Sequence, residues 1–226
     1  MLPVNWTLFM LGASLGSWLA CMAERQPARD QVQFSNRSHC PHCQHPLRAW
    51  QLIPILGLLL QRGRCHDCQH VIPRLSTVVE LVTGSLTLAL LSQPDRWSQL
   101  PLLLSDLVLI FNSLTDIHEL SVYPLTLWPP ALVGLWHHPP LLDWDSLILI
   151  CLLVGLYLVA RYLHQFGMGD VEVLGMLACV TSATNVLTSL TLAAVAALII
   201  FSCHPVRHLP FVPFLSWGFI VCTQLL

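Results

Sequence analysis

Residues 145–170, DSLILICLLVGLYLVARYLHQFGMGD, carry the pattern that decides the fold. A long apolar run is followed closely by Gly167-Met168-Gly169-Asp170, and another apolar run begins directly after it. Only 10% of the 226 residues are charged, so an acidic side chain between two apolar runs stands out. Ionisable groups at membrane depth are costly and usually mark function. Asp170 is therefore the first candidate functional residue.

Apolar segments of membrane-spanning length recur along the whole chain. A span needs about 17–25 predominantly apolar residues, and 55% of the residues here are hydrophobic. The segments of this kind are 5–23, 76–92, 100–117, 121–137, 145–163, 171–187, 189–203 and 210–226. We predict an all-α polytopic membrane protein with about eight transmembrane helices. Seven is the alternative, because the adjacent segments 171–187 and 189–203 could form one long helix.

Charge divides the chain into a first transmembrane helix over 1–23, a polar insert over 24–75 and a helical membrane core over 76–226. Most of the ten arginines lie between the first two spans: Arg25, Arg29, Arg37, Arg48, Arg62, Arg64 and Arg74. The positive-inside rule therefore predicts a cytoplasmic insert and an N-terminus outside. Arg161 and Arg207 then also fall inside, and only Arg96 falls outside. The net charge of −2 gives no reason to expect a nucleic-acid partner.

The polar insert contains two CxxC motifs, Cys40-Pro41-His42-Cys43 and Cys65-His66-Asp67-Cys68, separated by 21 residues. Paired motifs of this kind are typical of structural zinc sites, because each supplies two thiolates to one tetrahedral ion. The alternatives are a redox pair or cysteines without metal. Several histidines crowd the motifs, as possible substitute ligands or as solvated neighbours: His39, His42, His45, His66 and His70.

A second aspartate, Asp116, ends another apolar run 54 residues before Asp170. The predicted topology places both at the cytoplasmic face. Two carboxyl groups at close range share one proton and can act together as acid and base, which is the chemistry of aspartyl proteolysis. Gly167 and Gly169 suit a site where the backbone bends sharply or approaches a substrate closely.

A lone interfacial aspartate more often caps a helix or faces water than takes part in catalysis. We predict that structural role for four others: Asp95, Asp106, Asp143 and Asp145. Glu119 and Glu172 flank the two candidate aspartates and are either solvated or tune the site. Glu80 lies just inside the second span, where it pairs with an arginine such as Arg74 or lines the active-site cavity.

The chain resembles the type IV prepilin peptidases, membrane aspartyl proteases that remove leaders from pilins. The resemblance covers nearly the whole chain. It rests on Gly16-Ser17-Trp18-Leu19 with Glu24-Arg25, both CxxC motifs, Val79-Glu80-Leu81 with Thr83-Gly84, Asp116, Gly167–Asp170 and Pro210–Leu215. The first helix and its Glu24-Arg25 ending are similar to the competence-associated members of Gram-positive bacteria. The chain departs from many members at Ala20, where they carry asparagine, and at Glu172, where they carry lysine.

This resemblance implies an endopeptidase of the bacterial cytoplasmic membrane that cuts the short basic leader of prepilins or pseudopilins at the cytoplasmic face. It implies that Asp116 and Asp170 are catalytic and that a structural zinc ion binds the four cysteines. Many members also methylate the new N-terminus with S-adenosylmethionine. The departures at Ala20 and Glu172 question this second activity more than the first.

Two other functions are compatible with parts of the pattern. One is a non-catalytic membrane adaptor whose zinc-containing insert recruits a partner. The other is an intramembrane protease of the presenilin type, although that group is not expected to carry two CxxC motifs.

Overall fold

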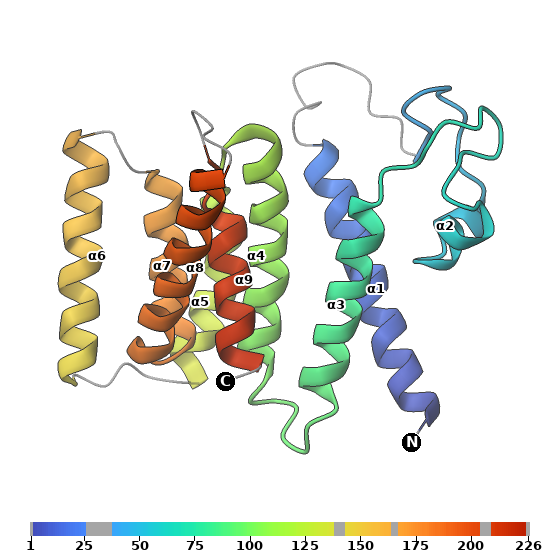
Figure 1. The fold of residues 1–226 in the computed structure, drawn as a ribbon. Helices are drawn as coiled ribbons and strands as arrows, with labels where there is room; N and C mark the ends of the chain where they lie inside the picture. The colour runs from blue at the N-terminus through green and yellow to red at the C-terminus, as the bar shows by residue number, and fades with distance from the viewer. Residues whose placement is uncertain (1, 26–37, 138–142, 164–166, 204–208, 225–226) are drawn as a thin grey trace. The chain divides into compact units, whose positions relative to one another are not determined.

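The computed structural model describes residues 2–25, 38–137, 143–163, 167–203 and 209–224. Over these residues, helices form the regular structure apart from two isolated β-bridges (Figure 1). The long helices are α1 (Leu2–Arg25), α3 (Leu75–Leu91), α4 (Leu100–Glu119), α5 (Pro124–His137), α6 (Trp144–Leu163), α7 (Met168–Val180), α8 (Ala183–Cys203) and α9 (Val212–Gln224). The insert adds η2 (Ala49–Leu52) and α2 (Leu56–Leu60). Arg29, Arg37 and Arg207 lie outside the described residues.

The predicted all-α membrane fold is confirmed. Four helices (α1, α4, α6 and α8) are long and apolar enough to cross a membrane. Two more, α3 and α9, are apolar but shorter, with 17 and 13 residues. A helix overlaps each of the eight predicted segments, whereas the number that cross the bilayer and their orientation stay predictions.

The single long helix considered for the segments 171–187 and 189–203 does not form, and the break between the two helices lies before the predicted boundary at residue 188. Helix α7 ends at Val180, and α8 begins at Ala183. Thr181 adopts an extended backbone, and the Ser182 hydroxyl accepts a hydrogen bond from the Asn185 N–H at 3.4 Å. A serine at this position satisfies one of the free N–H groups that open a helix, so the two helices separate here.

The chain divides into two compact units, residues 1–96 and 97–226. In the first, α1 packs closely along α3 (Figure 1). Gly12 lies against Thr83 and Thr87 and Gly16 lies against Thr83, and an added Cβ at either glycine would overlap these threonines. Small residues let membrane helices approach closely enough for dispersion contacts between their backbones, which explains this pairing.

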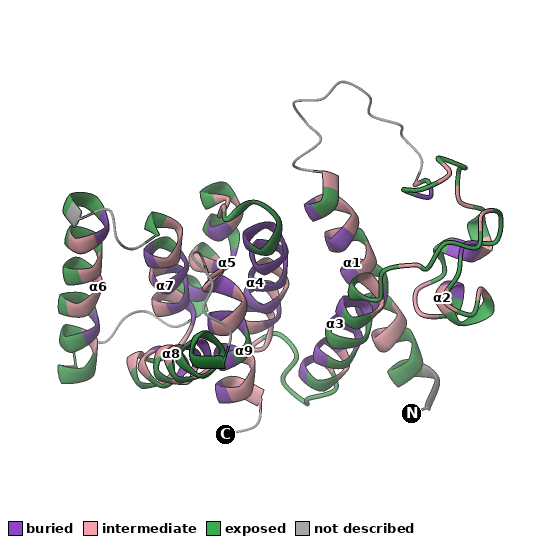
Figure 2. Ribbon diagram, turned by 45° about the horizontal axis from the view of Figure 1, so that its top comes forward, coloured by how far each residue is buried: buried purple, intermediate pink, exposed green. Residues whose placement is uncertain are grey.

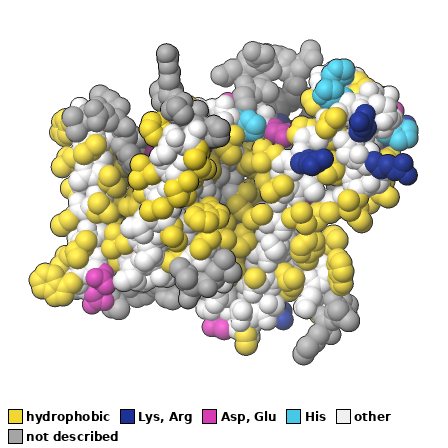
Figure 3. Space-filling view, in the orientation of Figure 1, with side chains coloured by type: hydrophobic (Ala, Val, Ile, Leu, Met, Phe, Trp, Pro, Cys, Tyr) yellow, Lys and Arg dark blue, Asp and Glu magenta, His cyan; other side chains and the backbone are white. Residues whose placement is uncertain are grey.

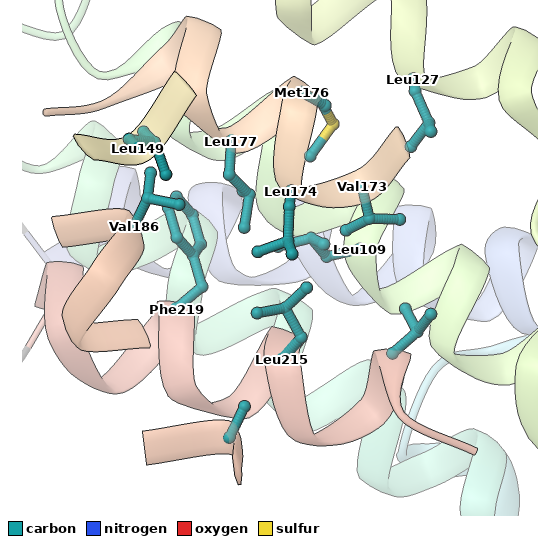
Figure 4. Close-up of a cluster of buried hydrophobic side chains, with 12 residues drawn as sticks. Leu109, Leu127, Leu149, Val173, Leu174, Met176, Leu177, Val186, Leu215 and Phe219 are labelled. Carbon is teal, nitrogen blue, oxygen red and sulfur yellow. The ribbon is translucent and has the colours of Figure 1, made fainter. Parts of the chain in front are cut away.

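The second unit is a bundle built around α4, α7 and α9. Helix α4 presents twelve buried residues, and Figure 2 shows burial along most of its length. An apolar core joins α4, α5, α6, α7, α8 and α9 through the residues in Figure 4, which include Leu109, Leu174, Leu177, Leu215 and Phe219. This core fixes α4 against α7 and α9, the helices that carry or contact the candidate aspartates.

Candidate active site and metal centre

The two CxxC motifs fold into matching turns. In the first, the Cys40 N–H donates to the His45 carbonyl and the Gln44 N–H donates to the Cys40 carbonyl, at 3.0 and 2.9 Å. In the second, the Cys65 N–H donates to the His70 carbonyl at 2.8 Å, and the Gln69 N–H donates to the Cys65 carbonyl at 3.0 Å. Gln44 and Gln69 both have positive φ, 58° and 59°. The same local turn is therefore formed twice.

The four thiols converge as the sequence predicts. The sulfur atoms of Cys40, Cys43, Cys65 and Cys68 all lie within 4.8 Å of one another, and the Sγ atoms of Cys40 and Cys68 are 3.8 Å apart. A tetrahedral zinc ion with Zn–S bonds of about 2.3 Å requires sulfur separations of about 3.8 Å. A hydrogen bond from the Cys43 backbone lowers the pKa of the Cys40 thiol to about 7, whereas the pKa of Cys43 is raised and that of Cys68 is raised to about 12. The geometry fits a zinc site.

The nearby histidines are neighbours of this cluster. Among the described residues, the group that could hold an ion contains only the four cysteines. His42 and His70 stack on each other, with ring centroids 4.5 Å apart. His45 and His66 each lie 3.5 Å from the Asp67 carboxylate, and Arg48 approaches the same group at 3.8 Å. Their polar contacts link the two turns around the cysteines.

Asp116 lies in the last turn of α4 and is only 7% exposed. Helix α4 ends at Glu119, because Leu120 takes a left-handed conformation and its N–H bonds to the Asp116 carbonyl at 3.0 Å. The Asp116 carboxylate accepts a hydrogen bond from the Val212 N–H at 3.1 Å, at the first residue of α9. Free N–H groups at a helix N-terminus stabilise negative charge, so α9 holds this carboxylate in place.

Asp170 lies in the first turn of α7, and its carboxyl group is close enough to Asp116 for electrostatic repulsion between them. The structure therefore brings α4 and α7 together at the two aspartates predicted from the sequence, which are 54 residues apart in the chain. Gly167 leaves room for the Asp170 side chain, since a Cβ there would lie 2.9 Å from Oδ2 of Asp170. A Cβ at Gly169 would lie 2.6 Å from Val122. The close approach therefore favours glycine most strongly at Gly169, because the Asp170 carboxyl group can shift to accommodate a side chain at Gly167.

The segment after α4 is fixed by Asn112, a fully buried side chain that the sequence reasoning did not select. Its Nδ2 donates to the Thr126 hydroxyl and its Oδ1 accepts from the Tyr123 N–H, each at 2.9 Å. These bonds hold the backbone beside Val122, which contacts the start of α7. Asn112 thus supports the approach of α7 to Asp116, and only its polar character within an apolar run signals this role.

The other acidic residues divide into three cases. Asp95, Asp143, Asp145, Glu119 and Glu172 are exposed. For Asp106 the prediction of a cap or a solvated role is wrong: it is fully buried, and neither carboxyl oxygen has a hydrogen-bond partner among the described residues. Glu80 accepts a hydrogen bond from the Ile55 N–H at 2.7 Å, a partner that the sequence did not predict.

Fold and geometry together define a helical membrane protein with a four-cysteine cluster that fits a metal ion and with two carboxyl groups on separate helices, near enough to repel each other. Residues 10–93 match the family described as the bacterial Peptidase A24 N-terminal domain. The chain is 29% identical to a type 4 prepilin-like proteins leader peptide-processing enzyme of Escherichia coli, over 84% of this chain and 76% of that protein. It is 38% and 34% identical to prepilin leader peptidase/N-methyltransferases of Aeromonas hydrophila and Bacillus subtilis. No solved structure matches the chain.

By these comparisons the chain is similar to enzymes that process prepilin leader peptides. The matches with the Aeromonas and Bacillus proteins cover 34% and 46% of those relatives. The matched family domain ends before α4 and therefore contains the four cysteines but neither aspartate.

Proposed function

We propose that this protein is an integral-membrane aspartyl endopeptidase that removes the leader peptide of type IV prepilins or pseudopilins. The observation that carries the proposal is the approach of Asp116 and Asp170 from two different helices to one end of the bundle. The relatives named above support the substrate class. The arginine-rich insert supports a cytoplasmic position for the site, in the bacterial inner membrane.

The hydrolysis needs one carboxylate to take a proton from water and one carboxylic acid to donate a proton to the scissile carbonyl oxygen. Asp116 is the better candidate for the base, because the Val212 N–H stabilises negative charge on it. Asp170 then holds the shared proton and donates it. The tetrahedral intermediate collapses when Asp116 passes the proton it took from water to the leaving amine, the peptide C–N bond breaks, and Asp170 recovers a proton from a hydroxyl of the intermediate.

We assign zinc a structural role at Cys40, Cys43, Cys65 and Cys68. Four thiolates close a tetrahedral shell and leave no position for a substrate or a reactive water. The insert has little apolar core of its own, so metal binding supplies much of its folding free energy. The exposed acids and histidines around the turns then serve solubility and local packing.

The direct test is cleavage of a co-expressed prepilin by the Asp116→Asn and Asp170→Asn variants. Each keeps the size and polarity of the side chain but removes its ability to exchange a proton, so both should lose cleavage. Asp145→Asn, at an exposed position on α6, is the matched control and should cleave normally. Full cleavage by either active-site variant would refute the dyad.

The same assay separates the alternatives. An adaptor would tolerate both aspartate variants and fail when a cysteine ligand is replaced. A presenilin-type protease would cut within apolar residues, which sequencing the product N-terminus reveals. Methylation, the second activity in the relatives' names, would add the mass of one methyl group to that N-terminus, and S-adenosylmethionine would then be the methyl donor.

A further inference from the structure

The insert carries an apolar surface that neither the metal centre nor the proposed hydrolysis uses. Between the two cysteine turns, residues 52–60 expose five large apolar side chains, here called the apolar tip: Leu52, Ile53, Leu56, Leu59 and Leu60. Leu59 and Leu60 are 63% and 64% exposed. Contiguous exposed apolar residues outside the long helices mark a site of interaction.

The apolar tip is an ordered structure. Gln51, which is buried, accepts a hydrogen bond from the Arg48 N–H at 2.7 Å and donates to the Gln61 side chain at 2.9 Å. Gly57 packs directly over the Gln51 backbone, where a Cβ would overlap the carbonyl. Polar contacts and close packing inside the segment therefore direct its leucines outward.

A hydrogen bond connects the segment that carries the apolar tip to α3. The Ile55 N–H donates to Oε2 of Glu80 at 2.7 Å, and Glu80 is 6% exposed. Ile55 has φ 63° and ψ −50°, a conformation that β-branched residues rarely adopt, so surrounding contacts must hold it. Glu80 is the sixth residue of α3, which places it about 7.5 Å along the helix axis from Leu75.

This bond attaches the segment of the apolar tip to the first turns of α3, a helix that we predict to enter the membrane. The first turns of α3 expose apolar side chains of their own: Leu75, Val78, Leu81 and Val82. Arg62, Arg64 and Arg74 are exposed on the insert and just before α3. Figure 3 shows arginine and histidine side chains gathered over the insert. Leucines beside guanidinium groups are the composition that binds an interface of acyl chains and anionic headgroups.

We propose that the apolar tip inserts into the lipid surface where α3 enters the bilayer, and that Glu80 is the positioning residue that sets its depth. The leucines contact acyl chains, and the neighbouring arginines contact lipid phosphates. The metal centre is thereby held at a fixed height above the membrane. A peptide substrate or a second copy of the chain would need no anchoring at this depth, so lipid is the occupant that the geometry favours.

The test uses the full-length protein in nanodiscs containing anionic lipid. A photo-crosslinking phenylalanine derivative replaces Leu59, Leu60 or, as control, His45, whose exposed side chain lies on the first cysteine turn. Lipid adducts should form at the two leucine positions and not at His45. Crosslinks from the leucines to a second copy or to a co-reconstituted prepilin, or equal lipid labelling at His45, would overturn the proposal.

Two variants test whether Glu80 sets the depth of the apolar tip. Glu80→Leu should lower lipid crosslinking from position 60 about fivefold, the population change expected from losing one hydrogen bond. Glu80→Gln retains an acceptor oxygen and should crosslink normally. Unchanged crosslinking in Glu80→Leu would refute the role of Glu80. As a measurement free of substitutions, amide exchange across 56–61 should be slower in nanodiscs than in detergent, and equal rates would refute insertion. None of these readouts depends on hydrolysis.

Discussion

Replacing Gly169 with alanine tests whether close helix approach creates the dyad. The added Cβ would lie 2.6 Å from both Cβ and Cγ2 of Val122. Ordinary contacts between carbon atoms are about 3.5–4.0 Å, so α7 must move by about 1 Å and carry Asp170 away from Asp116. Displacements of this size can reduce catalysis about 100-fold, which corresponds to about 2.7 kcal/mol of transition-state stabilisation.

The measurement is kcat/KM for prepilin cleavage by purified protein, with expression and thermal stability recorded in parallel. Gly175→Ala is the matched control, because it lies on the same helix and its Cβ would meet nothing within 4 Å. Val122→Gly in the Gly169→Ala background removes both overlapping carbons and should restore most of the activity. Wild-type activity in Gly169→Ala, or no recovery in the double variant, would show that this contact does not position Asp170.

Three further substitutions test the cysteine cluster and two groups of hydrogen bonds near the aspartates. Cys65→Ser should reduce bound zinc from about one ion per chain to near zero and expose residues 38–74 to proteolysis; the exposed Cys151→Ser is the control in elemental analysis. Asn112→Ala leaves the Tyr123 N–H without its acceptor at a cost of about 1–3 kcal/mol, so the apparent melting temperature and prepilin cleavage should both fall, and an unchanged variant would contradict the role of Asn112. Ser216→Ala removes the 2.9 Å hydrogen bond with Ser113 between α4 and α9. The free energy of unfolding should fall by about 0.6 kcal/mol. Abolished cleavage in this variant would show that the two hydroxyl groups do more than join the helices.

Local sequence features predicted much of this protein. Apolar length located the helices, because a helix that faces lipid must present apolar side chains along its whole length. The break at Thr181-Ser182 was missed because apolar length says little about helix ends, although Ser182 is a recognisable cap. The cysteine cluster followed from spacing alone, since each turn positions its own pair of thiols within four residues.

Relations between helices were decided only by tertiary structure. The sequence marked Asp116 and Asp170 but contained no sign that Val212 donates to one of them or that Val122 limits the approach of the other. It predicted that Asp106 caps a helix or faces water, whereas packing buries this residue completely. It left the partner of Glu80 open, and the fold supplied the backbone of Ile55, 25 residues away. The physical reason is that hydropathy and spacing act along one helix, whereas the neighbours of a side chain depend on how separate helices pack.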